Sequence, residues 1–196
     1  MQNYIVNYLN STVDFINDIN ISQIERILVT IDKVRMDGNR LFVCGNGGSA
    51  AHAMHFAGDL AKNVTSDEVG RFNVISLCDN ITAFTAYSND IGYDVVFSEQ
   101  MKNFNLTKGD CLLGISSSGN SPNIVKACEY AKTKGACIIG LCGFTGGKLK
   151  QMADFYLHIN SNEYEKVEDL HMIVLHIIVS YFKNNKNIYP RLGALE

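Results

Sequence analysis

The sequence predicts an α/β protein with a doubly wound parallel sheet and helices on both of its faces. Two observations support this prediction. Short, nearly continuous apolar runs alternate along the chain with longer amphipathic stretches, as expected when helices connect strands that are buried on both faces of a sheet. The 196 residues contain two prolines and no Ser/Pro-rich linker, which indicates one domain over 1–196. Within it we expect a helical segment at about 1–37 and an α/β core at about 38–196.

Each element follows from this alternation, in chain order. Runs rich in Val, Ile, Leu and Phe predict the strands, and amphipathic stretches predict the helices. The expected strands are Leu41–Cys44, Val74–Cys78, Cys111–Ile115, Cys137–Cys142 and Phe155–His158. The expected helices are Tyr4–Ile16, Ile21–Met36, Ser49–Lys62, two within Ile81–Phe104 around Asn89–Gly92, then Pro122–Lys134, Gly147–Met152 and Tyr164–Phe182. In such a fold the ligand binds beyond the carboxyl ends of the strands.

The composition argues against several classes of protein. A net charge of −3 and a pI near 5.9 do not provide the basic surface that nucleic-acid binding needs. No apolar run reaches the ~18–20 residues of a membrane span, and the first twenty residues lack the pattern of a signal peptide. We therefore expect a cytoplasmic protein. The six cysteines show no CxxC spacing, so we expect buried thiols rather than disulfides or a zinc–thiolate site.

A glycine-rich loop follows the first expected strand. It reads Gly45-Asn46-Gly47-Gly48-Ser49-Ala50-Ala51. Its glycines allow a sharp turn and a close approach to a ligand, and the helix that follows favours an anion. The loop also matches the dinucleotide fingerprint G-x-G-x-x-[G/A]. That fingerprint needs an acidic residue about 20 positions on, whereas Asp79 lies about 30 positions on, so a dinucleotide site is weakly supported.

A serine-rich loop follows the third expected strand and is the more specific signal. It reads Gly114-Ile115-Ser116-Ser117-Ser118-Gly119-Asn120-Ser121-Pro122-Asn123. One serine there would be an ordinary helix cap, but four hydroxyls before a helix that begins with proline form a neutral cradle for a phosphate group. The two loops together predict a phosphorylated small molecule as the ligand.

These motifs carry a resemblance. GNGGSAA followed by His55, ISSSGNSPN, and the segment from Glu168 to His176 resemble the sugar isomerase (SIS) domain family and, within it, the phosphoheptose isomerases. The similarity covers nearly the whole chain. It implies a flavodoxin-like, five-stranded parallel sheet with N-terminal helices, and a homotetramer with active sites at subunit interfaces. It also implies conversion of sedoheptulose 7-phosphate to D-glycero-D-manno-heptose 7-phosphate through an enediolate, for bacterial heptose and surface-glycan (lipopolysaccharide or capsule) biosynthesis.

Histidines and carboxylates recur on two expected helices. His55 and Asp59 are four residues apart and share a helix face. Glu168 and His176 are eight apart, so they share a face within about 80°, and Asp169 aligns somewhat better with His176. Two histidines and two carboxylates could bind zinc, but spacing alone favours an ordinary solvated helix face. We expect His52 and His158 to be incidental.

The resemblance makes the assignments specific. It implies zinc bound by His55, Asp59, Glu168 and His176, with Asp59 and His176 as the acid–base pair. Asp59 stands where the family has Glu, Glu168 where it has Gln, Ser117 where Thr is common and His52 where Asp is frequent. The substrate-contacting positions are Asn46, Gly47, Gly48, Ser49, Asn89, Asp90, Ser116, Ser117, Ser118, Ser121 and Glu168.

One residue role is a hypothesis, and two alternatives to the phosphoheptose isomerase interpretation remain open. Because Asp59 is one methylene shorter than Glu, we hypothesise that Glu168 partly takes over the role of the base, and we count it among the catalytic residues. The departures at 59 and 168 could instead mark an isomerase for another sugar phosphate. A non-enzymatic SIS relative that binds a protein partner is the third interpretation; the retained His55, the carboxylate at 59 and His176 argue against it.

Overall fold

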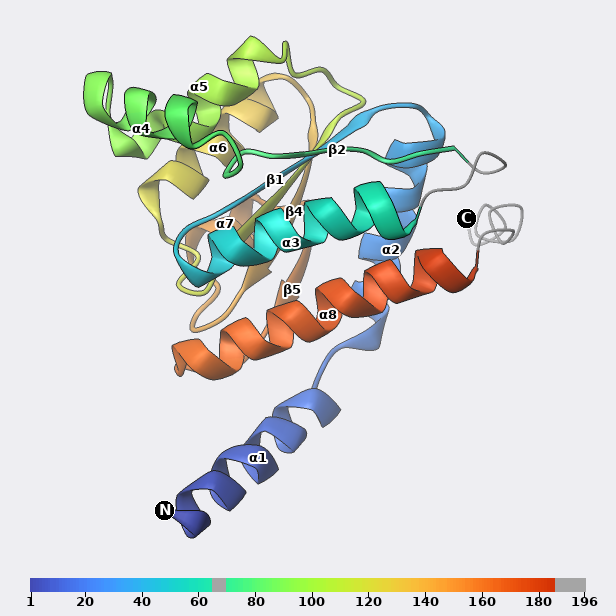
Figure 1. Cartoon of the computed structure of the whole chain (residues 1–196), viewed down its shortest axis with the longest axis vertical. Helices are drawn as coiled ribbons and strands as arrows, with labels where there is room; N and C mark the ends of the chain where they lie inside the picture. The colour runs from blue at the N-terminus through green and yellow to red at the C-terminus, as the bar shows by residue number, and fades with distance from the viewer. Residues whose placement is uncertain (65–69, 186–196) are drawn as a thin grey trace.

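The computed structural model describes residues 1–64 and 70–185. The expected alternation of strands and helices is present throughout these residues (Figure 1). In chain order the elements are α1 (Gln2–Asn17), α2 (Ile21–Met36), β1 (Arg40–Gly45), α3 (Gly48–Asn63), β2 (Asn73–Ser76), α4 (Ile81–Asp90), η1 (Tyr93–Val95), α5 (Val96–Asn103), β3 (Cys111–Ser116), α6 (Pro122–Thr133), β4 (Cys137–Cys142), α7 (Gly147–Met152), β5 (Phe155–His158) and α8 (Tyr164–Asn184).

The five strands form one parallel sheet in the order β2-β1-β3-β4-β5. This is the flavodoxin-like order, in which the chain reverses direction across the sheet between β1 and β3. The predicted fold class is therefore confirmed. Most strand boundaries differ by at most one residue, and the largest difference is in β2, which ends at Ser76 rather than Cys78. Leu77 still donates its N–H to Val43 at 2.9 Å, but the Cys78 N–H turns to the Ser76 hydroxyl at 3.2 Å.

Helices cover both faces of the sheet, and two apolar cores result. On one face α2, α3 and α8 pack through Ile27, Phe56 and Leu175. On the other face α5, α6 and α7 pack through Phe97, Ile124 and Leu149, among other residues. The cysteines belong to these apolar regions, because all six are free and four are fully buried. The prediction of buried thiols is therefore confirmed. Burial raises the pKa of the Cys142 thiol to about 12, which keeps it protonated at neutral pH.

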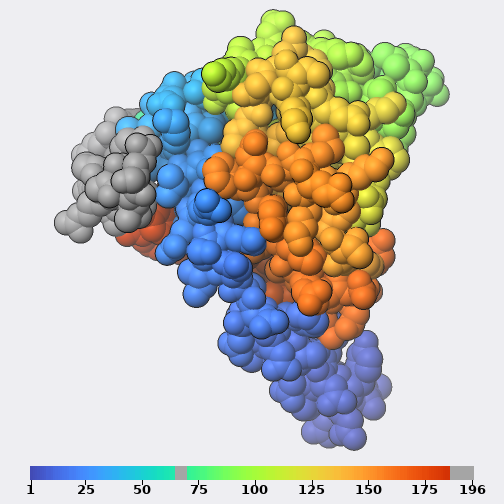
Figure 2. All heavy atoms as spheres, turned by 180° about the vertical axis from the view of Figure 1, so that it is seen from behind, coloured from blue at the N-terminus to red at the C-terminus, as the bar shows by residue number. Residues whose placement is uncertain are grey.

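Helix α1 projects from the body of the molecule (Figures 1 and 2). None of its residues is buried, and the apolar side chains of Ile5, Leu9 and Val13 are exposed. Its attachment to the core includes a hydrogen bond from the Tyr8 hydroxyl to Asp169 on α8 at 2.9 Å. An exposed apolar stripe on a projecting helix is the kind of surface that packs against another protein surface. Within the described residues, no helix combines the length and the apolar character that a membrane span requires.

Candidate active site

The site is built where α3 and α8 lie side by side and run in the same direction (Figure 1). Two cross-helix pairs show the register of this packing. Gly48 at the start of α3 faces Glu168, and His55 two turns later faces His176. The first strand-end loop leads directly into α3, so this pair of helices begins at the carboxyl edge of the sheet. Residues about 120 positions apart in the chain therefore meet where α3 packs against α8.

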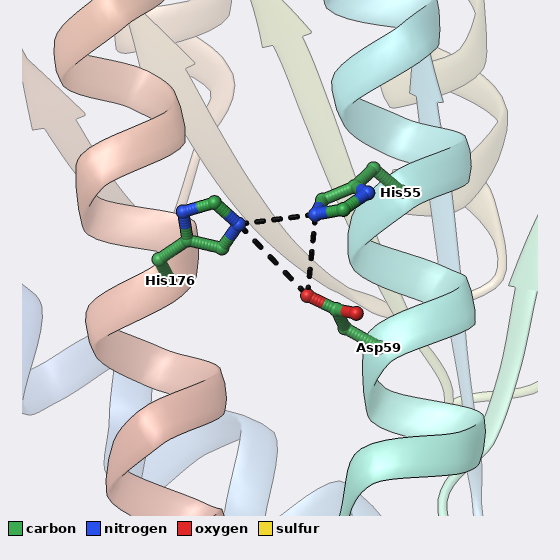
Figure 3. Close-up of side chains that lie close together, drawn as sticks. All are labelled: His55, Asp59 and His176. Carbon is green, nitrogen blue, oxygen red and sulfur yellow. Dashed lines mark hydrogen bonds and ion pairs between the residues drawn. The ribbon is translucent and has the colours of Figure 1, made fainter.

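Three of the predicted metal ligands converge between α3 and α8 (Figure 3). The Nε2 atoms of His55 and His176 are 3.0 Å apart. The Oδ2 atom of Asp59 lies 3.3 Å from the His55 nitrogen and 3.9 Å from the His176 nitrogen. Asp59 is oriented by the next turn of its own helix, because its Oδ1 atom accepts a hydrogen bond from Asn63 at 2.8 Å.

These three atoms fit a zinc ion. Ligand atoms about 2.0–2.1 Å from zinc in a tetrahedral arrangement lie roughly 3.3 Å from one another, and two imidazoles with one carboxylate is a common donor set for catalytic zinc. Both imidazole side chains are about half exposed, at 52% and 53%, and Asp59 is 20% exposed. A metal held there would be accessible to a ligand from solvent.

The fourth predicted metal ligand, Glu168, lies apart from these three, beside Gly48 at the start of α3. A Cβ atom on Gly48 would sit 2.3 Å from the Glu168 Oε2 atom, so the carboxylate occupies the space that this glycine leaves open. Burial raises the pKa of the Glu168 carboxyl, and the nearby charges of Glu165 and Asp169 raise it further. Among the described residues, the cluster with metal-ligand spacing contains His55, Asp59 and His176, and Glu168 lines a separate cavity instead.

That cavity, of about 120 Å³, lies at the carboxyl ends of β1 and β3. This is the point where the strand order reverses, which is the position that doubly wound folds use for ligands. Most of the predicted substrate-contacting side chains line it. The lining residues are Asn46, Ser49, Ile115, Ser116, Ser117, Ser118, Ser121, Tyr164 and Glu168.

The serine loop presents hydroxyls in different bonding states. The Ser116 and Ser121 hydroxyls are 3.2 Å apart, and the Ser118 hydroxyl accepts the Asn120 N–H at 3.2 Å. The Ser117 hydroxyl is buried and has no hydrogen-bonding partner in the described structure, which is unusual for a buried polar group. Gly119 shapes the turn, since its φ is +65° and a Cβ there would lie 2.0 Å from the Gly146 carbonyl oxygen.

Four predicted substrate contacts are not among the lining residues: Gly47 and Gly48 in the glycine loop, and Asn89 and Asp90. Asn89 and Asp90 are exposed at the end of α4, where the Asn89 amide donates to the Asp90 carboxylate at 2.8 Å. The same region contributes Tyr93, whose hydroxyl donates to Asn46 at 2.7 Å. Sequence reasoning missed Tyr93 and also Tyr164, which lines the cavity. No motif signals either residue, because each acts through its place in the tertiary structure.

Two further histidines lie between α3 and α8, among the site residues. His171 is fully buried, and neither of its ring nitrogens has a hydrogen-bonding partner of ordinary geometry in the described structure. Burial lowers its pKa to about 4, and His52 on α3 lowers it further, while the Cys142 carbonyl opposes this. Burial also lowers the pKa of His52. His158, by contrast, is bonded at both ring nitrogens, to Lys150 at 3.3 Å and to the Phe144 carbonyl oxygen at 2.8 Å.

The buried His171 predicts a loss of stability in mild acid. The unfolded chain binds a proton at this residue near pH 6.5, but the folded chain binds it only near pH 4. The stabilisation is therefore complete above about pH 6.5, and about 2 kcal/mol of it is lost by pH 5. Urea unfolding at pH 7.5 and pH 5 measures this difference. His171→Gln should reduce it and His158→Gln should not; an equal pH dependence in all three proteins would contradict the assignment.

The sequence and the fold can now be compared with those of known proteins. The family model described as SIS domain matches residues 4–143. A phosphoheptose isomerase from Aneurinibacillus thermoaerophilus is 36% identical over 183 residues, covering 91% of each chain. One from Trichlorobacter lovleyi is 42% identical over 141 residues, covering 72% of this chain and 71% of the relative. The solved phosphoheptose isomerase from Neisseria gonorrhoeae superimposes with a TM-score of 0.85 at 27% identity, covering 93% of this chain and 98% of the other. The chain belongs to the phosphoheptose isomerase family of SIS-domain proteins.

Proposed function

We propose that this protein interconverts sedoheptulose 7-phosphate and D-glycero-D-manno-heptose 7-phosphate, a ketose–aldose isomerisation. One observation carries the proposal most directly. A hydroxyl-lined cavity at the start of α3 and α8 and a histidine–carboxylate cluster two turns further along lie on the same pair of helices. Two helical turns span about 11 Å. A phosphorylated sugar therefore has an anion cradle at one end and acid–base chemistry at the other.

The serine loop binds the phosphate group in this proposal. Its hydroxyls donate to the phosphate oxygens, and the α6 dipole favours the negative charge. The Ser117 hydroxyl gains from the ligand the partner that it lacks within the protein. Backbone groups of Gly47 and Gly48 approach the sugar closely because no Cβ intervenes. Asn89 and Asp90 contact the sugar only when it extends beyond the lined cavity.

The chemistry needs a base and a proton carrier at C1 and C2. Asp59, by its position in the family, removes the C1 proton, and Glu168 is the second candidate. His55, Asp59 and His176 would hold a zinc ion, which would supply a Lewis acid for the carbonyl chemistry. His176 is also the candidate to move a proton between O1 and O2. Its Nε2 atom cannot hold a metal and a proton at the same time, so these two roles exclude each other at that atom.

The setting of the enzyme is also a proposal. We expect a homotetramer whose subunits pack through the exposed apolar face of α1, with active sites at the interfaces, working in the cytoplasm on heptose for a surface glycan. The free energy of packing scales with the apolar area removed from water, and Ile5, Leu9 and Val13 on α1 provide such area.

A panel of five- to seven-carbon ketose phosphates, with and without added zinc, tests the function. We expect aldose formation from sedoheptulose 7-phosphate at the highest kcat/KM. A higher kcat/KM on another ketose phosphate would contradict the heptose assignment and support the second isomerase interpretation. No turnover of any member, together with no stoichiometric zinc, would support the non-enzymatic interpretation.

A further inference from the structure

Asn46 and Asn123 form a reciprocal pair of side-chain amides between the two ligand-binding loops. The Asn46 Nδ2 atom donates to Asn123 Oδ1 at 2.9 Å, and the Asn123 Nδ2 atom donates to Asn46 Oδ1 at 2.8 Å. Asn46 belongs to the glycine loop after β1, and Asn123 belongs to the first turn of α6 after the serine loop. Asn123 is 1% exposed and Asn46 is half-buried, so the pair is anchored inside the protein at Asn123 and reaches the cavity at Asn46.

A backbone group fixes the orientation of this pair. The Ile124 N–H donates to Asn123 Oδ1 at 2.9 Å, which places the oxygen of that amide. The Asn123 Nδ2 atom then has to face the Asn46 oxygen, and Asn46 cannot rotate without bringing two like atoms together. The Tyr93 hydroxyl donates to the same Asn46 oxygen at 2.7 Å. Each amide oxygen thus accepts two hydrogen bonds and has no lone pair left.

One of the two N–H groups of the Asn46 amide is still available to donate a hydrogen bond. Asn46 borders the cavity, but as an acceptor it is saturated. Tyr93 adds a third segment to the pair, because it follows the α4 end that carries Asn89 and Asp90, and an ion pair between Asp94 and Lys126 ties the same segment to α6. Three predicted ligand-binding segments are therefore joined at Asn46.

We propose that Asn123 is a positioning residue that sets the distance and orientation between the glycine loop and the serine loop through Asn46. The serine loop holds the phosphate and the glycine loop guides the sugar, so this distance aligns the reacting carbons with the acid–base groups. This inference rests on the proposed isomerase function. A displacement of about 1 Å at a reacting centre can cost about 100-fold in rate.

Two substitutions of Asn123 separate positioning from the bond to the Ile124 N–H in the first turn of α6. Asn123→Asp and Asn123→Ser both retain a side-chain oxygen that can accept this N–H. Neither can restore the pair, because Asp always opposes one oxygen to the Asn46 oxygen and Ser is too short to reach it. We expect kcat to fall about 30-fold in both variants while KM changes less than about threefold. The thermal midpoint should stay within a few degrees of the wild type.

The matched control is Asn80→Asp, which changes another asparagine whose side chain accepts a backbone N–H at the start of a helix. The Asn80 side chain accepts from Ala83 at the start of α4, and its kinetic constants should match those of the wild type. Wild-type-like kcat in Asn123→Ser would overturn the proposal. So would a loss confined to the charged Asp variant, or a rise in KM at constant kcat. An inactive wild type would instead contradict the proposed function, and this inference would fall with it.

An alanine cycle gives a second, independent test. If the two amides act as one unit, the double substitution of Asn46 and Asn123 by alanine lowers kcat no further than the worse single substitution. Multiplied effects of the single substitutions would mean that Asn46 acts on the substrate without Asn123, and the pair would have no positioning role.

Discussion

His176→Ala is expected to lower kcat/KM by at least about 1,000-fold and to remove bound zinc. The substitution leaves two of the three ligand atoms that converge between α3 and α8, so the Lewis acid is lost with the metal. A Lewis acid contributes several kcal/mol to the transition state, and each ~1.4 kcal/mol is tenfold in rate. Metal analysis of the purified protein and initial rates with sedoheptulose 7-phosphate measure both effects.

His158→Ala is the control for this experiment. Its ring is bound by Lys150 and by a backbone carbonyl on another part of the fold, so the variant should keep both zinc and turnover. A chelated wild type with full activity would contradict the role of the metal. A His176→Ala protein that retains zinc at the wild-type level would show that the metal binds elsewhere.

The fold could be predicted from the sequence because its signals are local. The buried strands are short apolar runs, and the helices between them carry apolar faces at helical spacing. The serine loop is equally readable, since four hydroxyls before Pro122 lie within six residues. His55 and Asp59 share a face on the same helix, so two of the three members of the histidine–carboxylate cluster could be paired without tertiary information.

The remaining features depend on how two distant helices pair. Spacing could suggest that Glu168 and His176 share a helix face, but eight residues also separate them by about 12 Å along the axis. Which groups on α3 they meet depends on the register of α3 against α8. Glu168 meets Gly48, a residue without a side chain, whereas His176 meets His55. The Asn46–Asn123 pair was hidden for the same reason, because its partners lie 77 residues apart.

If Glu168 shares the role of base with Asp59, Glu168→Gln lowers kcat by about 100-fold while zinc stays bound. The carboxylate lies in the substrate cavity and apart from the His–Asp cluster, so the substitution removes a base without removing a metal ligand. Asp59→Asn should instead lose zinc together with activity. This contrast distinguishes the two carboxylates. Unchanged turnover in Glu168→Gln would rule out the hypothesis that Glu168 replaces the shortened Asp59 as base.

The pH dependence of kcat sharpens this test. A base works when deprotonated, so kcat falls as the pH drops through the pKa of Glu168, which burial and the charge of Glu165 raise. Glu165→Gln removes an exposed charge from the same helix. It should therefore shift the acidic limb of the profile to lower pH while maximal turnover stays unchanged. Glu168→Gln should abolish that limb. The limb could instead persist in Glu168→Gln and stay in place in Glu165→Gln. Another group would then be the base, and Asp59 is the carboxylate beside the histidines that can serve.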